Sequence, residues 1–273
     1  DVLNDLPTFV SESEPWFRDA LQLLVEQPTI SPGMTDPAPI LAGLEVAKQV
    51  VERSGGEVEL VPSGGTPSLI ARFTHPAPKA RIVIYNHFDV QPATAANWDQ
   101  EDPFRFEVRE DPEREFLYLG RGTTDDKGPA LCALRAADWV KRHELPIEVV
   151  LLWETEEEIG SPNFEDVLEA RKDVLAGDAV IVSDTIWPSA DSPAISTGLR
   201  GGLLASLRLR TASKESHSGL TGGVARNPLR ELAALATAIG NAEFWKLNAR
   251  PAPHEEVESY LRTGFDPEYF RKS

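Results

Sequence analysis

The chain has 273 residues and a formal net charge of −17, because 27 Lys and Arg residues stand against 44 Asp and Glu residues. A chain this acidic repels phosphate backbones, so nucleic-acid binding driven by the overall charge is excluded. No apolar run reaches the roughly 18 residues that a membrane span needs. The single cysteine, Cys132, excludes an internal disulfide and a zinc site built from several cysteines. We therefore expect a cytoplasmic protein with no nucleic-acid or membrane partner, in which His, Asp and Glu hold any metal.

The first two thirds of the chain predict helices that alternate with strands. Apolar residues at helical spacing predict helices at about residues 13–25, 37–54, 129–141 and 164–175. Short apolar runs predict the strands Val58–Val61, Leu69–Phe73, Ile82–Tyr85, Ile147–Trp153 and Ala179–Val182. The last two strands are expected to be buried. A hairpin is predicted from Phe104–Val108 and Phe116–Leu119.

This alternation is typical of the α/β class, in a three-layer α/β/α domain with a largely parallel sheet. The composition changes near residue 200. Apolar and polar residues alternate over Leu203–Thr211, which predicts a half-exposed antiparallel strand, and a helix is predicted over about residues 228–239. No clear periodicity follows Arg250. We therefore expect one domain over residues 1–200 and the start of an α+β domain over residues 201–273.

Four motifs that contain acidic residues or histidine follow predicted strands. They are His87-Phe88-Asp89, the Gly120–Gly128 loop, the acidic run Glu154–Gly160, and Ser183-Asp184. In open α/β sheets, ligands bind beyond the C-terminal ends of the strands. Carboxylates and an imidazole together suit zinc, manganese or cobalt. The four motifs therefore predict a metal site at one edge of the sheet.

Each motif, taken alone, also has an ordinary structural explanation. A histidine at a strand end is commonly a hydrogen-bonded structural residue. The pair Asp125-Asp126 with flanking glycines fits a turn. The acidic run from Glu154 fits a solvated helix start, where the helix dipole favours negative charge. The metal site is favoured because all four motifs end buried strands.

The motifs HFDVQP, GRGTTDDKGP, ETEEEIGSP and VSD, in this order, resemble those of a known family. It is the di-zinc amidohydrolase and peptidase family of carnosinase, bacterial dipeptidases, aminoacylase and succinyl-diaminopimelate desuccinylase. The motifs GRGTTDDKGP and GLRGG are most similar to the carnosinase-like dipeptidase branch. The resemblance implies metal-dependent hydrolysis of a dipeptide or short peptide. It also implies that the first domain is catalytic and that the second is a lid and dimerisation domain.

The resemblance further implies which residues bind metal. Two divalent ions, zinc or else manganese or cobalt, would be bridged by Asp125. Asp126 is not chosen, because the second position of the Asp-Asp-Lys motif varies in the family. His87 and Asp184 would complete the first metal site, and Glu158 would bind the second metal.

Three further residues are implied by the same resemblance. Glu157 would be the general base that takes a proton from a metal-activated water and passes it to the leaving amine. Asp89 would hold the catalytic site in place from behind the ligands. Glu154 and Glu156 fall outside the site. His217, in a His-Ser-Gly motif, would bind substrate and stabilise the oxyanion from the partner subunit of a homodimer.

The family supplies one more ligand of the second metal, a late histidine. His254 is the only histidine after His217, and its surroundings match no such motif. The resemblance therefore predicts that the chain is incomplete on its C-terminal side. It also predicts that residues 1–273 alone are nearly inactive and bind the second metal poorly.

Two other functions stay open at this point. The chain could be a non-catalytic acidic module that binds calcium, although calcium sites use six to eight oxygen ligands and the histidine favours zinc. It could also hydrolyse an N-acyl amino acid, as the deacylase and desuccinylase branches do. Metal analysis separates the first alternative, and a substrate panel separates the second.

Overall fold

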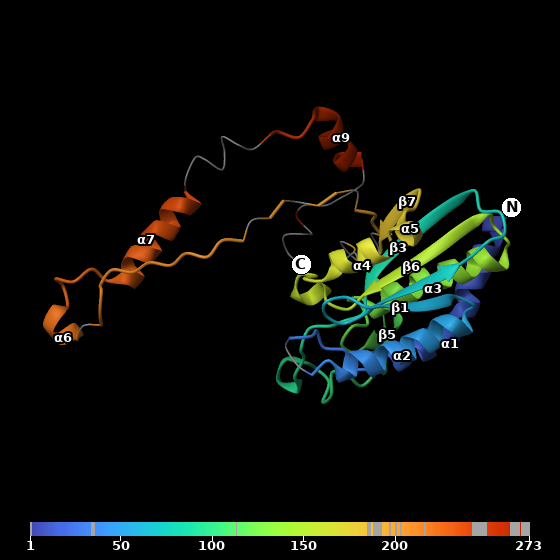
Figure 1. Cartoon of the computed structure of the whole chain (residues 1–273), viewed down its shortest axis with the longest axis horizontal. Coiled ribbons are helices and arrows are strands. Elements are labelled where there is room, and N and C mark those ends of the chain that lie inside the picture. The colour runs from blue at the N-terminus through green and yellow to red at the C-terminus, as the bar shows by residue number, and fades with distance from the viewer. Residues whose placement is uncertain are drawn as a thin grey trace. The chain divides into compact units, whose positions relative to one another are not determined.

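The structure is a computed structural model of the chain (Figure 1). It describes residues 2–33, 36–112, 114–184, 187, 193–196, 198–199, 201–202, 204–215, 217–241, 250–262 and 268. These residues belong to two units, Asp1–Ile186 and Trp187–Ser273. The domain assignment 1–200 and 201–273 stays a prediction.

A five-stranded sheet forms the centre of the first unit. Its strands, in spatial order, are β1 (Glu57–Val61), β2 (Ser68–Phe73), β6 (Ile147–Glu154), β3 (Ala80–His87) and β7 (Ala179–Val182). β3 pairs in parallel with β6 and β7, whereas β2 is antiparallel to β1 and β6. All strands except β2 therefore run in the same direction, and the predicted α/β fold with a largely parallel sheet is confirmed.

Helices lie on both faces of this sheet, which gives three layers (Figure 1). One face is covered by α1, α2 and α3, and the other by α4 and α5. The helices of the first unit, including the short 3₁₀ turns η1 to η3, are η1 (Val2–Asp5), α1 (Leu6–Val25), α2 (Ala38–Arg53), η2 (Ala95–Asn97), α3 (Lys127–Arg142), η3 (Glu157–Ile159), α4 (Phe164–Ala170) and α5 (Lys172–Leu175).

Alternating residues of the central strands contribute to two separate cores. Leu151 packs with the residues of α1, α2 and α3, whereas Val150 and Leu152 pack with the α4 side. This period of two explains why β6 carries apolar residues on both of its faces from Val149 to Trp153. At its end, fully buried Trp153 stacks on Phe88 with ring centroids 6.2 Å apart. Burying one such side chain stabilises the fold by roughly 1.5–3 kcal/mol, so these contacts fix the strand ends where the polar motifs begin.

Two helix boundaries differ from the predicted ones. α1 begins at Leu6, before the predicted start near Ser13, and Pro15 lies inside it. Ser13 resembles a capping residue in the sequence, but its hydroxyl donates to the Phe9 carbonyl within the helix, at 2.6 Å. The helix predicted over 164–175 is divided at Arg171 into α4 and α5. Pro37 is the N-cap of α2, and the Asp36 carboxylate before it accepts from the N–H of Ala38 at 3.0 Å.

The predicted hairpin is present, with antiparallel strands β4 (Glu107–Asp111) and β5 (Glu115–Leu119). The prediction that Ala179–Val182 is buried is wrong. All four residues are exposed, and Val180 exposes 64% of its surface. Within the described residues, β7 is an edge strand that pairs only with β3, so its apolar composition does not report burial.

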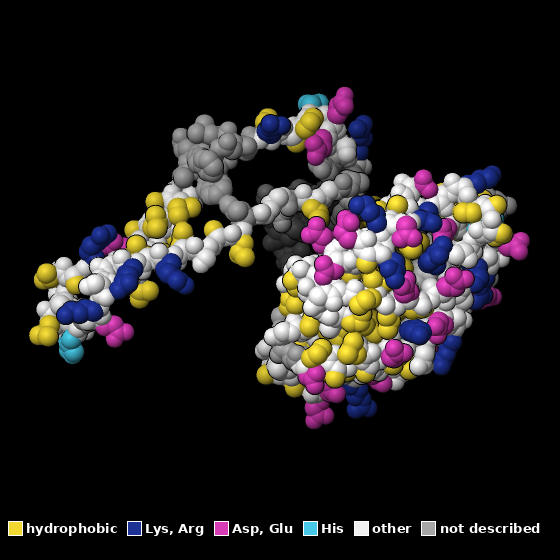
Figure 2. Space-filling model, in the orientation of Figure 1, with side chains coloured by type: hydrophobic (Ala, Val, Ile, Leu, Met, Phe, Trp, Pro, Cys, Tyr) yellow, Lys and Arg dark blue, Asp and Glu magenta, His cyan; other side chains and the backbone are white. Residues whose placement is uncertain are grey.

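The second unit contains α6 (Ser218–Thr221), α7 (Pro228–Gly240) and α9 (His254–Arg262). α7 was predicted, and Asn227 caps it by accepting from the N–H of Leu229 at 3.0 Å. The strand predicted over Leu203–Thr211 is wrong for the described residues 204–211, which have no regular secondary structure. α9 was not predicted, because only three of its nine residues, Val257, Tyr260 and Leu261, are apolar, although they stand at helical spacing. Hydrophobic side chains are exposed along α7 (Figure 2). No helix in the described parts of the chain has the length and apolar character of a membrane span.

Candidate metal centre

His87 is the last residue of β3 and is buried. Its Nδ1 lies 2.9 Å from the backbone oxygen of Asp89, and its Nε2 lies 2.8 Å from Asp125 Oδ1. A carbonyl oxygen only accepts, so in the neutral ring Nδ1 carries the hydrogen and Nε2 is left to bind a metal. Burial opposes a charge on His87, but hydrogen bonds with Asp125 and Asp89 raise its pKa to about 11. The same neighbouring carboxylates would attract a divalent cation.

Asp125 and Asp126 are adjacent in sequence but have opposite surroundings. The Asp125 side chain is 52% exposed and reaches the His87 imidazole. Asp126 is buried, and its Oδ2 accepts hydrogen bonds from the Asn86 side chain at 2.9 Å and from the His87 N–H at 3.0 Å. Its Oδ1 has no hydrogen-bond partner in the described part of the chain. Asp126 therefore holds the end of β3, whereas Asp125 faces the open side of the site.

Lys127 is the first residue of α3 and connects this loop to the first helix. It is fully buried, and its Nζ donates to the backbone oxygens of Leu24 and Gln27, each at 2.8 Å. These oxygens lie at the C-terminal end of α1, where the helix dipole favours a cation. Burial lowers the pKa of Lys127 to about 7. The loop that carries Asp125 is thus anchored to the end of α1.

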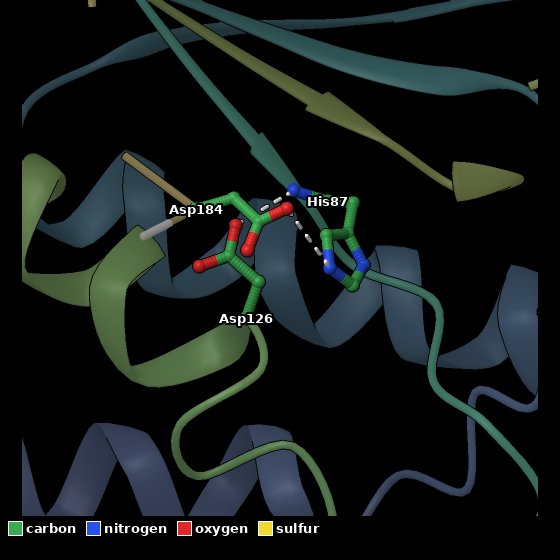
Figure 3. Close-up of side chains that lie close together, drawn as sticks. All are labelled: His87, Asp126 and Asp184. Atoms are coloured by element: carbon green, nitrogen blue, oxygen red, sulfur yellow. Dashed lines mark hydrogen bonds and ion pairs between the residues drawn. The ribbon is translucent and has the colours of Figure 1, made fainter. Parts of the chain in front are cut away.

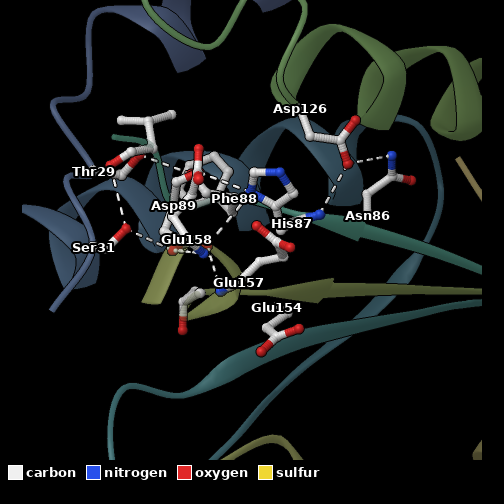
Figure 4. A network of polar contacts seen from close by, with 12 residues as sticks. Thr29, Ser31, Asn86, His87, Phe88, Asp89, Asp126, Glu154, Glu157 and Glu158 are labelled. Atoms are coloured by element: carbon white, nitrogen blue, oxygen red, sulfur yellow. Dashed lines mark hydrogen bonds and ion pairs between the residues drawn. The ribbon is translucent and has the colours of Figure 1, made fainter. Parts of the chain in front are cut away.

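The acidic run after β6 forms the turn η3, which carries Glu157 and Glu158. Asp89 is fully buried and lies next to this turn (Figure 4). Its Oδ1 accepts from the N–H of Glu157 and its Oδ2 from the N–H of Glu158, both at 3.2 Å. Ser31 Oγ also donates to Asp89 Oδ2 at 2.8 Å. Asp89 therefore joins the end of β3 to the turn after β6.

Replacing Asp89 tests this support. Asp89→Asn keeps the shape of the side chain but turns one acceptor oxygen into a donor, which then faces the N–H groups of η3 or the Ser31 hydroxyl. We expect affinity for divalent metal to fall about 10–100-fold, the usual effect of a residue that orients metal ligands. Competition with a metal-binding dye measures this change. Asp99→Asn, at an exposed position, is the matched control. Equal metal affinity in both variants would contradict the supporting role.

Two groups of side chains are close enough to hold a metal ion. In each group the ligand atoms lie within 4.8 Å of one another. One group is His87, Asp125 and Glu158, and the other is His87, Asp126 and Asp184. Figure 3 shows the second group, in which Asp184 Oδ2 lies 3.9 Å from His87 Nε2. The predicted ligands thus converge, and Asp126, which the sequence analysis set aside, joins them.

Three residues near the site were missed by the sequence analysis. Asn86 and Gln91 flank the His87–Asp89 motif, and their polar character directly beside a strand end was the available signal. Gln91 Nε2 donates to Glu158 Oε2 at 3.0 Å and to its backbone oxygen at 3.1 Å. Ser31 is 58 positions from Asp89 along the chain and carries no local signal.

His217 belongs to the second unit and is exposed. It precedes α6, and its Nδ1 accepts from the N–H of Gly219 at 3.0 Å. This contact fixes the imidazole as a cap of the short helix. The substrate-binding role of His217 stays a prediction.

Comparison with known proteins gives consistent results for sequence and fold. Residues 83–265 match the family model Peptidase_M20, which describes peptidase family M20/M25/M40. The chain is 34% identical over 177 residues to "Cys-Gly metallodipeptidase dug1" of Schizosaccharomyces pombe, a match that covers 63% of this chain and 36% of that protein. It is 28% identical over 279 residues to "Beta-Ala-His dipeptidase" of Homo sapiens, covering 93% of this chain and 54% of that protein.

A solved structure of the dipeptidase Dug1p from Saccharomyces cerevisiae superimposes with a TM-score of 0.76 at 23% identity, covering 99% of this chain and 60% of that one. At this identity the likeness shows the fold alone. The chain spans about half or less of the length of the curated relatives it matches.

Proposed function

This chain belongs to peptidase family M20/M25/M40, and we propose that the protein hydrolyses the peptide bond of dipeptides with two divalent metal ions. Membership of this family implies divalent metal binding, which agrees with the groups of His, Asp and Glu described above. The observation that carries the proposal is the convergence of His87, Asp125 and Glu158 from three separate segments, directly beside Glu157. The names of two relatives, a Cys-Gly and a Beta-Ala-His dipeptidase, support dipeptides as the substrate.

The residues present fit a pair of divalent ions. The donors are one imidazole and several carboxylates, the ligands that zinc, manganese and cobalt accept. We assign Asp125 as the shared ligand, His87 and Asp184 to one ion, and Glu158 to the other. Two ions held there would polarise the scissile carbonyl and lower the pKa of a water molecule towards neutrality.

Glu157 is the proposed general base. Burial raises the pKa of its carboxyl; the charge of His87 opposes the rise, and Glu158 and Asp184 add to it. A raised pKa makes a carboxylate a better proton acceptor. It takes a proton from the attacking water and returns it to the amine that leaves. The Asp89 carboxylate accepts from the backbone N–H of Glu157, so the position of the base is fixed.

A substrate panel with the full-length protein tests the proposal. We expect Ala- and Gly-containing dipeptides with a free amino group to be turned over at least about tenfold faster than their N-acyl counterparts. A chelator should remove the activity, and zinc, manganese or cobalt should restore it. Faster turnover of N-acyl amino acids would assign the deacylase activity instead. Purified protein that binds no divalent metal would contradict the proposal.

We also propose that the protein is a cytoplasmic homodimer in which His217 contacts the substrate of the neighbouring subunit. The His-Ser-Gly motif at His217 supports the contact with the substrate, and the presence of a single cysteine in the sequence supports the cytoplasmic location. Light scattering after size exclusion measures the subunit number. His217→Ala should then lower kcat without changing metal content, because the imidazole is not assigned to either ion.

A further inference from the structure

Glu156 is a buried carboxylate directly before the proposed general base. Only 4% of its surface is exposed. The backbone N–H of Thr66 donates to its Oε1 at 3.0 Å, and Asn163 Nδ2 donates to its Oε2 at 2.8 Å. The two donors come from the loop before β2 and from the residue before α4. Leaving such a group unpaired in the interior is costly, so these hydrogen bonds hold three segments together.

The loop before β2 is built around this carboxylate. A Cβ atom added to Gly65 would lie 1.8 Å from Glu156 Oε1 and 2.6 Å from Asn163 Nδ2. No side chain fits in that space, so glycine is required for the close approach. The hydroxyls of Thr66 and Thr155 lie 2.8 Å apart and add a second link between the same segments.

The backbone of Glu156 also closes the turn that follows. Its carbonyl oxygen accepts from the N–H of Ser161 at 2.9 Å and from that of Ile159 at 3.3 Å. The η3 turn is therefore fixed on two sides. Asp89 holds the N–H groups of Glu157 and Glu158 from the β3 side, and Glu156 holds the turn from the side of β2 and α4.

We propose that Glu156 is a positioning residue for Glu157 and Glu158. Its side-chain hydrogen bonds connect the η3 turn to the loop before β2 and to Asn163, a connection that we call the tie. These bonds fix the positions of the two functional carboxylates. The roles of Glu157 and Glu158 rest on the proposed function, whereas the tie itself does not.

The geometry makes hydrogen bonding, not charge, the essential property of this side chain. A glutamine at position 156 can accept from the Thr66 N–H with its oxygen and donate to the Asn163 side-chain oxygen once that amide turns over. A leucine of similar size can do neither. Glu156→Gln is therefore the conservative variant that should retain the tie, and Glu156→Leu should break it.

Hydrogen exchange of the metal-free protein measures the tie without relying on activity. For Glu156→Leu we expect the amides of residues 157–161 to exchange at least about tenfold faster, because the turn opens locally. Zinc affinity should fall about tenfold, and kcat should fall about 10–100-fold with KM changed less than about twofold. Glu156→Gln should stay within about threefold of the parent in each measurement. Glu165→Leu, at an exposed position of α4, is the matched control.

Asn163→Ala provides a second test that leaves Glu156 in place and removes one donor. It should raise the exchange of the same amides, by less than Glu156→Leu does, and it carries the test if Glu156→Leu does not fold. Parent-like exchange and zinc affinity in both variants would overturn the proposal, as would equal losses in Glu156→Leu and Glu156→Gln. If exchange and zinc affinity change as expected but the parent protein hydrolyses no dipeptide, the positioning role stands and the proposed function fails.

Discussion

Asp125→Ala is expected to remove bound metal and dipeptidase activity together. Asp125 is the residue assigned to both ions, and its Oδ1 lies 2.8 Å from His87 Nε2. Residues that only support metal ligands already contribute about 10–100-fold to metal affinity, so loss of a shared ligand should cost more than about 100-fold. Elemental analysis of the dialysed protein, together with turnover of a Gly-containing dipeptide, measures both effects.

Two further variants define how the Asp125 result is interpreted. Asp99→Ala removes an exposed carboxylate of the same unit and should leave metal content and dipeptide turnover at the values of the unmutated protein. Asp126→Asn tests the alternative group that contains Asp126 and Asp184. Metal content that survives Asp125→Ala but is lost in Asp126→Asn would move the shared ligand to Asp126.

Glu157→Gln is expected to keep the metals and the fold but to lower kcat about 10²–10⁴-fold, the range of a lost general base. The amide has nearly the same shape as the carboxylate and cannot take a proton at neutral pH. The backbone N–H of Glu157 still reaches Asp89, so the η3 turn should remain in place. Single-turnover kinetics at saturating zinc separates this chemical step from binding.

Glu158→Gln is the matched comparison from the next position in the chain. Glu158 belongs to the group with His87 and Asp125, and Gln91 donates to its Oε2 at 3.0 Å. We expect weaker metal binding in this variant, with activity partly recovered by added zinc. An exchange of behaviours between the two variants would shift the assignment of base and ligand by one residue.

The sequence predicted the sheet well because two signals identify its strands, an apolar run and a polar motif directly after it. β6 is apolar from Val149 to Trp153, and polar motifs begin where β3 and β6 end, at His87 and Glu154. Parallel strands bring such ends to one edge, so the meeting of His87 with Glu158 could be expected before the structure was known. The contact between the His87 ring and the backbone oxygen of Asp89 joins residues only two positions apart, so it could also be expected from the sequence.

Other features depend on contacts that no local pattern reports. Ser31 and Asp89 meet across 58 positions, and Glu156 meets Thr66 across 90. The exposed residues of β7 look like a buried strand, because pairing in parallel with β3 requires β-forming residues even at a sheet edge. Over residues 204–211 the apolar alternation is present but no partner strand pairs with it in the described structure, so periodicity alone gave a wrong prediction.

The anchoring of Lys127 limits how the protein can be shortened for laboratory use. A version that began at residue 28 would lose both backbone oxygens that the Lys127 amine binds. It would also uncover the Gly120 loop, because a Cβ on Gly120 would lie 2.5 Å from Val25 Cγ1, so the loop rests directly on the end of α1. A buried amine without hydrogen-bond acceptors costs free energy, so Lys127 would leave its buried position. Asp125, two positions before it in the chain, would be displaced with it. The N-terminal helix therefore belongs to the minimal metal-binding protein, although it contributes no residue to either group of candidate metal ligands described here.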